Sequence, residues 1–219
     1  MNPDPLALGL GQLRQDPQYP RIPVARHTQL VEAALADGRV LAAEVAANHG
    51  NDPEAIAVQC AIPVDRSERD AGYGSVVVHA EYVERPPRIT LYVRSIAALA
   101  RRSVGTQTAV DQAALERVFL AHELYHHFDC ARGEHRLARR HRVDIVRIGA
   151  WRWTSGLASL AEIAAGSFAR ELLGLPFHPV ILDFLLVQTM NHGEHSFLYP
   201  LEGCGDYGAE RSEGQGNGF

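Results

Sequence analysis

The most constraining feature of this sequence is the run His-Glu-Leu-Tyr-His at residues 122–126. It lies in a segment whose apolar residues recur with helical spacing, and Asp111 is placed to cap a helix that runs to about Ala131. Histidines four positions apart on a helix differ by about 40° around its axis. We therefore expect His122 and His126 to reach one metal ion from the same helix.

Two carboxylates of this helix fit roles around such an ion. Glu123 follows the first histidine directly and points to the flank of the ligand face, where it could accept a proton from a metal-bound water. Asp129 returns to the face of His122 within about 20°, so it is a candidate to orient a ligand imidazole. The same face carries apolar residues, which would set the site against the core.

A catalytic zinc ion needs a third protein ligand and an open position for water. Glu162 is the best candidate, because it shares one stripe of a helix expected over Leu157–Leu173 with small and apolar residues. A carboxylate on such a stripe is costly to bury unless it is paired or binds a metal, whereas Glu171 falls on the opposite side. Two alternatives stay open. Glu162 could instead form an ion pair with Arg152 or Arg170, and the third ligand could instead be His135 or His141.

The remaining sequence predicts further helices and a small sheet. Segments 55–64, 75–84 and 88–94 are rich in Val, Ile and Tyr, and the last two alternate as β-strands do. A proline pair at residues 86–87 predicts a tight connection between those two strands. We expect an α+β fold with helices packed on a small, mainly antiparallel sheet. Further helices are expected at His27–Leu35, Val40–Asn48 and Pro179–Met190.

Length and composition favour one compact domain with flexible ends. The 219 residues are 46% hydrophobic and 21% charged, which suits a single buried core. We expect a loosely ordered arm at residues 1–22, one domain at 23–202 and a flexible Gly-rich tail at 203–219. The chain start lacks a signal-peptide pattern and no apolar run is long enough to span a bilayer, which predicts a cytoplasmic protein without membrane contact. A net charge of -5 argues against direct nucleic-acid binding.

The motif and the later helix together resemble the ImmA/IrrE family of zinc metallopeptidases. That family typically combines HExxH with a helix of the form Glu-x-x-Ala-x-x-Phe-Ala-x-x-Leu-Leu-x-x-Pro, and residues 162–176 match this form. The strand expected ahead of the motif also resembles the family's layout. The resemblance implies a zincin-like domain that binds Zn²⁺ through two histidines and a glutamate, with a second glutamate as catalytic acid/base; these are His122, His126, Glu162 and Glu123.

The resemblance also implies a partner. Members of the family are bacterial or phage regulators that cleave, or control the cleavage of, a DNA-binding repressor, so the implied substrate is a peptide or protein such as a transcriptional repressor. The chain departs from the family in three ways. Tyr125 stands where the family often has Gly, the gap between His126 and Glu162 is long and holds an Arg-rich insert, and no separate helix-turn-helix module is evident.

The sequence therefore predicts a zinc-dependent metallopeptidase that hydrolyses peptide bonds with a zinc-activated water. The alternative is a catalytically silent zinc-binding regulator that uses the same scaffold to recognise a partner. A di-iron helical bundle shares the spacing of Glu123 and His126, but it needs a second such pair on another helix, and the β-rich middle of the chain argues against it.

Four other features carry weaker expectations. The arginine-rich segment 132–147 is interpreted as a solvated face rather than a docking site, and a strand edge in the expected sheet could pair with an extended peptide. Trp151 and Trp153 are interpreted as packing residues. Late polar residues could return to the site and stabilise an oxyanion, although a surface-loop role is favoured for each; these are His192, His195 and Tyr199.

Overall fold

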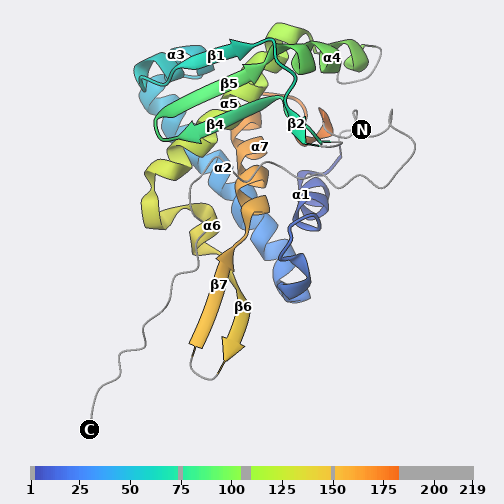
Figure 1. Ribbon diagram of the computed structural model, residues 1–219, viewed down its shortest axis with the longest axis vertical. Helices are drawn as coiled ribbons and strands as arrows, with labels where there is room; N and C mark the ends of the chain where they lie inside the picture. Colours follow the sequence, from blue (N-terminus) through green and yellow to red (C-terminus); the bar gives the residue numbers. More distant parts are fainter. Residues whose placement is uncertain (1–2, 74–75, 105–109, 149–150, 183–219) are drawn as a thin grey trace.

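The computed structural model describes residues 3–73, 76–104, 110–148 and 151–182. These residues form a mixed α+β fold that is mostly helical, with small sheets, as expected for the fold class (Figure 1). No helix among them is long and apolar enough to cross a membrane. The helices are α1 Pro5–Leu13, α2 His27–His49, α3 Pro53–Gln59, α4 Val93–Ser103, α5 Gln112–Ala131, α6 Leu137–Arg140 and α7 Ala158–Leu173, with 3-10 turns at Tyr19–Arg21, Val24–Arg26 and Gly133–His135. The strands are β1 Val64–Ser67, β2 Gly72–Tyr73, β3 Val76–Val77, β4 Ala80–Glu84, β5 Pro87–Tyr92, β6 Arg142–Ile148 and β7 Trp151–Gly156.

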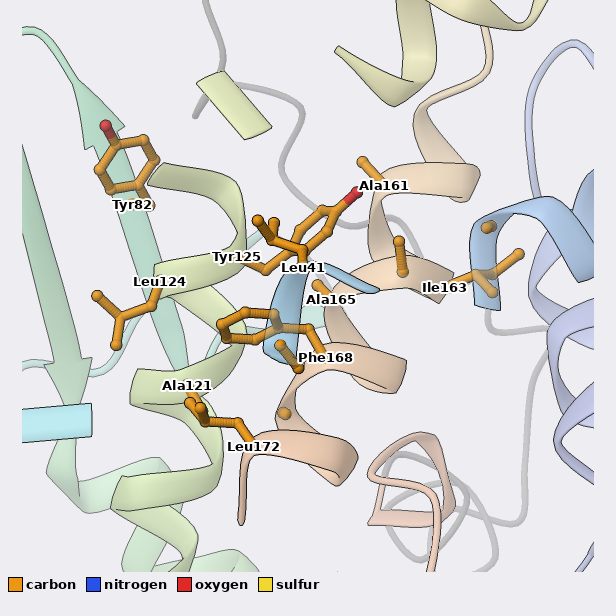
Figure 2. Close-up of a cluster of buried hydrophobic side chains, with 14 of the residues drawn as sticks. Leu41, Tyr82, Ala121, Leu124, Tyr125, Ala161, Ile163, Ala165, Phe168 and Leu172 are labelled. Atoms are coloured by element: carbon orange, nitrogen blue, oxygen red, sulfur yellow. The ribbon is translucent and has the colours of Figure 1, made fainter. Parts of the chain in front are cut away.

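Helix α7 lies at the centre, packed along both α2 and α5 (Figure 1). Small residues allow the close approach to α2, since a Cβ added at Gly38 would lie 2.8 Å from Ser167 Cβ and against the Ala164 carbonyl oxygen. Aromatic side chains fill the junction with α5, where the rings of Tyr125 and Phe168 are 5.9 Å apart and fully buried (Figure 2). This packing fixes the two helices that carry the motif and Glu162.

The main sheet has the strand order β1-β5-β4. β4 and β5 are antiparallel, with Tyr82 opposite Ile89, and are joined by the short connection expected at the proline pair. β1 is parallel to β5, so the sheet is mixed. Helix α5 packs against β4 and β5, and the side chains of Tyr82, Ile89 and Leu91 are buried. The predicted antiparallel pair is confirmed, and β4 is an edge strand within the described part of the chain.

Two predictions of secondary structure are wrong. Segment 55–64 was expected to be a strand, but Pro53–Gln59 forms helix α3, because Pro53 at the first helical position has its φ angle already set for a helix. The two helices expected between residues 27 and 48 form one helix, α2, which Gly38 does not interrupt. Gly50 at φ 82° ends that helix.

The chain start and the segment before α7 also differ from expectation. Residues 5–13 form α1 where a loosely ordered arm was expected, and Leu13 is fully buried against the helical core. The Asp16 carboxylate accepts hydrogen bonds from the backbone N–H and the hydroxyl of Ser159, which ties this segment to the start of α7. Residues 142–156 form the β6–β7 hairpin, which projects from the helical body at the end opposite the main sheet (Figure 1).

Several expectations lie wholly or mostly outside the described residues. The helix expected at Pro179–Met190 is described only to residue 182, and residues 180–182 are helical. The tail at 203–219 and the late polar residues His192, His195 and Tyr199 are not among the described residues.

Candidate metal centre

Helix α5 presents both histidines of the motif. Its first turn is capped by the Asp111 side chain, which accepts a hydrogen bond of 2.7 Å from the Ala114 N–H, as the sequence predicts. The helix then runs unbroken through the motif to Ala131. The imidazole rings of His122 and His126 are 5.1 Å apart and lie on one side of the helix. Both are mostly buried.

Helix α7 brings Glu162 to these two rings. One carboxylate oxygen lies 3.1 Å from His122 Nε2 and the other lies 3.5 Å from His126 Nε2. Metal–ligand distances of about 2.1 Å and tetrahedral angles put two ligand atoms of one zinc ion ~3.4 Å apart. The observed spacings match that value, and one ligand atom from each residue lies within 4.8 Å of the others. These three residues could therefore hold a metal ion in the positions that they occupy here.

The charges of the cluster attract one another. Burial by itself would raise the pKa of Glu162, but the adjacent His126 and His122 hold this pKa well below its usual value. Burial opposes a charge on His126 in the same way, yet the Glu162 carboxylate raises the pKa of His126 to about 9. Among the described side chains, the ion-pair partners of Glu162 are thus the two imidazoles.

Glu123 lies beside this cluster without joining it. Its side chain is 7% exposed, and burial raises the pKa of its carboxyl, with smaller opposing effects from His122 and His126. The carboxyls of Glu162 and Glu81 raise the pKa of Glu123 further. A buried carboxyl with a raised pKa is a stronger base in its ionised form.

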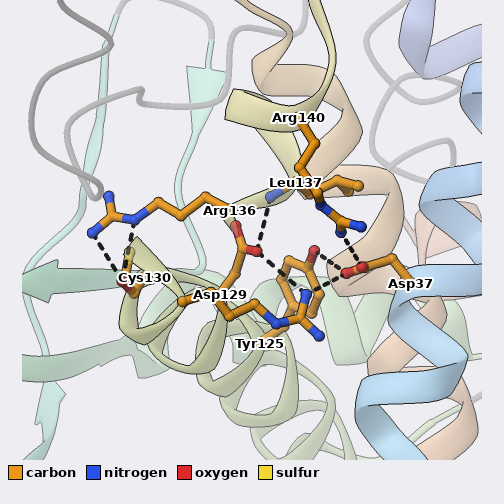
Figure 3. A network of polar contacts seen from close by, with 8 residues as sticks. Asp37, Tyr125, Asp129, Cys130, Arg136, Leu137 and Arg140 are labelled. Carbon is orange, nitrogen blue, oxygen red and sulfur yellow. Dashed lines mark hydrogen bonds and ion pairs between the residues drawn. The ribbon is translucent and has the colours of Figure 1, made fainter. Parts of the chain in front are cut away.

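Asp129 does not take the position predicted for it. Its Oδ1 accepts a hydrogen bond of 3.0 Å from the Leu137 N–H and lies 3.5 Å from Arg132 Nη1, because α6 folds back over the end of α5 (Figure 3). Asp129 therefore holds the end of the motif helix in place, and its described partners are Leu137 and Arg132.

Tyr125, inside the motif, has a structural partner on α2. Its hydroxyl donates a hydrogen bond of 3.0 Å to Asp37 Oδ2, and Arg132 donates to the same oxygen at 2.8 Å. Arg140 pairs with the other oxygen of Asp37 (Figure 3). The tyrosine that departs from the family pattern thus links the motif helix to α2.

The arginine-rich segment is largely engaged within the molecule. Arg136 donates to the Cys130 carbonyl and pairs with Glu84 on β4, while Arg139 pairs with Glu134. The interpretation of this segment as a purely solvated face is therefore incomplete, because its guanidinium groups bind α2, β4 and neighbouring backbone. His135 and His141, the alternative ligands, stand outside the cluster of ligand atoms formed by the motif histidines and Glu162.

One buried histidine near the site was not singled out from the sequence. His178 is 3% exposed and its ring packs over Gly166 on α7. His178 follows the end of α7 in the short run Phe177-His178-Pro179, and no periodic pattern marks it. The stripe of small residues beneath it, which includes Gly166, was the available signal.

No family model, no curated protein and no solved structure matches this chain.

Proposed function

We propose that the protein is a zinc-dependent metallopeptidase with a zincin-like domain. The observation that carries the proposal is the meeting of His122 and His126 with Glu162 at zinc-ligand spacing, with Glu123 buried beside them. A zinc ion held there would acidify a water molecule and polarise the carbonyl of a bound peptide.

Glu123 performs the proton transfers in this proposal. Its carboxylate accepts a proton as the water oxygen bonds to the carbonyl carbon, and it then gives that proton to the leaving amine as the C–N bond breaks. The raised pKa of Glu123 supports both steps, because a carboxyl that holds its proton more tightly is a stronger base in its ionised form.

The edge strand β4 supports a peptide as the substrate class. Within the described residues β4 pairs with β5 along one side, and its other side offers backbone groups to an extended chain. β4 packs against α5, the motif helix. The resemblance to the ImmA/IrrE family makes a DNA-binding repressor the first protein substrate to test.

A catalytically silent zinc-binding regulator is the second candidate function. The burial of Glu123 favours it, because burial raises the pKa of that carboxyl and only the ionised carboxylate can accept a proton from water. Such a protein would bind zinc and a partner without cleaving the partner.

Metal analysis and a cleavage assay test these proposals together. We expect one zinc ion per chain in the wild type and in Glu171→Ala, whose side chain is exposed on α7, and loss of that zinc in Glu162→Ala. Glu123→Gln should keep its zinc while cleavage of a random peptide library falls at least about 100-fold. Zinc bound with no cleavage by the wild type would favour the regulator, and zinc retained by Glu162→Ala would remove the proposed site.

A further inference from the structure

Within the described residues, one ring nitrogen of His178 has a hydrogen-bond partner and the other has none. The backbone N–H of Val180 donates to its Nδ1 at 3.4 Å. Its Nε2 is buried and has no hydrogen-bond partner in the described part of the chain. Burying a polar atom without a partner costs free energy, so such an atom in a functional region calls for an explanation.

The ring of His178 lies on α7 one helical turn from Glu162. A Cβ added at Gly166 would be 2.7 Å from the His178 Cε1 atom, so the ring sits directly on that helix position. Gly166 is one turn along α7 from Glu162 and shares its face. His178 nevertheless stands outside the group of ligand atoms within 4.8 Å of one another.

The hydrogen bond at Nδ1 determines what Nε2 can do. Because Nδ1 accepts from a backbone N–H, the neutral imidazole carries its proton on Nε2. Burial, followed by the charges of Arg170 and His122, lowers the pKa of His178 to about 4, so the ring is neutral at physiological pH. The unpartnered atom is therefore an N–H donor.

We propose that His178 Nε2–H donates a hydrogen bond to the oxyanion formed during peptide hydrolysis. This inference rests on the proposed peptidase function. As the water oxygen bonds to the carbonyl carbon, the carbonyl π electrons move onto its oxygen and Glu123 takes the water proton. His178 stabilises that oxygen while keeping its own proton. The C–N bond then breaks, the carbonyl re-forms, and the Glu123 proton passes to the amine.

A second buried histidine provides the matched control. His79 is 7% exposed and its Nε2 also has no partner among the described residues. Its Nδ1 faces the Ser95 hydroxyl, which directs its proton to backbone carbonyls, so Nδ1 is the donor and Nε2 is an acceptor. Its ring stacks on Phe119. His79→Phe removes an equally buried imidazole that cannot donate from Nε2.

The activity test uses the zinc-loaded full chain and a peptide that the wild type cleaves from a random library. We expect His178→Phe to lower kcat by about 10²–10³ with KM changed less than about threefold, the loss seen when one oxyanion donor is removed. His178→Gln, whose amide can donate from a position close to that of Nε2, should recover about tenfold or more of kcat. His79→Phe should stay within about threefold of the wild type.

A binding test on the zinc-loaded protein does not depend on turnover. Calorimetry measures the Kd of N-phosphoryl-leucyl-tryptophan, which presents a tetrahedral anion, and of acetohydroxamate, which binds zinc through two planar oxygens. His178→Phe should raise the first Kd about tenfold and leave the second unchanged.

The outcomes separate the role proposed for His178 from the proposed peptidase function. Wild-type kcat and wild-type affinity for the phosphoryl dipeptide in His178→Phe would overturn the role of His178, as would a loss of thermal stability without either change. No binding of the phosphoryl dipeptide by the wild type would overturn it too. A wild type that binds zinc and cleaves no peptide would instead refute the peptidase proposal, and the oxyanion role of His178 would be refuted with it.

Discussion

At the scale of single residues, the protonation of His126 competes with metal binding. Its imidazole is buried against Glu162, which raises the pKa of His126 to about 9. A folded pKa above the unfolded value of about 6.5 contributes stability that is complete below pH 6.5 and is lost as the pH rises through 9. A metal ion binds the deprotonated ring, so it competes with that proton.

Zinc affinity should therefore depend on pH over an unusual range. We expect the affinity to rise about tenfold per pH unit between pH 6.5 and 9 and to level off above pH 9, with about one proton released per zinc at pH 7.5. A competition titration against a zinc chelator at several pH values measures the affinity. An affinity that is already constant above pH 7.5 would show that His126 has an ordinary pKa.

The Tyr125 hydroxyl is a second residue whose contribution can be measured. Its hydrogen bond to Asp37 is buried, but Asp37 keeps two arginine partners when the hydroxyl is removed. Tyr125→Phe should therefore lower the free energy of unfolding by about 1–2 kcal/mol, as measured by urea denaturation. Tyr19→Phe loses a longer, 3.4 Å contact to His27 and serves as the control, with an expected cost of about 0.5 kcal/mol or less. Equal losses of unfolding free energy in the two variants would mean that the buried hydrogen bond from Tyr125 to Asp37 stabilises no more than the longer contact of Tyr19.

At the scale of elements, the contact between α2 and α7 positions the glutamate ligand. Gly38 on α2 lies against the backbone of α7 at Ala164, close to Glu162 in the chain. The same glycine is a poor helix former, which is why the sequence suggests a break in α2. Glycine is nevertheless required here, because a side chain at this position would separate the two helices.

Gly38→Ala should separate the helices and disturb the site. A Cβ there would clash with Ala164 and Ser167, and overpacking of this kind costs about 1–3 kcal/mol. We expect zinc affinity to fall along with the free energy of unfolding. Gly11→Ala in α1 is the matched control, since a Cβ there meets nothing within 4 Å and the change should stabilise by about 0.4–1 kcal/mol. Stabilisation by both substitutions, measured by urea denaturation, would refute the close packing.

At the scale of the whole molecule, the described part of the β6–β7 hairpin joins the core only at its base, where Val143 is buried. Trp151 and Trp153 on β7 are 69% and 54% exposed, and Val146 opposite Trp153 is also exposed. The prediction that these tryptophans are packing residues is wrong. Their alternating sequence pattern describes a strand with one apolar face, but no element of the described part of the chain covers that face.

Replacing both tryptophans should therefore have little effect on stability. The double variant Trp151→Thr/Trp153→Thr is expected to change the free energy of unfolding by less than about 0.5 kcal/mol, measured by far-ultraviolet circular dichroism in urea. Phe168→Ala, in the core between α5 and α7, should cost about 3–5 kcal/mol in the same assay. A loss above about 1 kcal/mol in the double variant would mean that the hairpin is covered in solution.

The sequence alone determined the features that depend on near neighbours in the chain. The cap at Asp111 and the spacing of His122 and His126 follow from helical geometry, which acts over a single turn. The hairpin of β4 and β5 followed from alternation and a proline pair. Segment 55–64 misled because its apolar residues suit either a buried strand or a short helix, and periodicity does not separate the two.

Tertiary structure decided which distant residues complete the site. Glu162 was a candidate because a carboxylate on a small-residue stripe needs a partner, but only the packing of α7 on α5 brings it within 3.1 Å of His122. The same packing places His178 over Gly166 and turns Asp129 toward Leu137. These contacts join residues far apart in the chain. They depend on burial and loop closure, which produce no periodic pattern in the sequence.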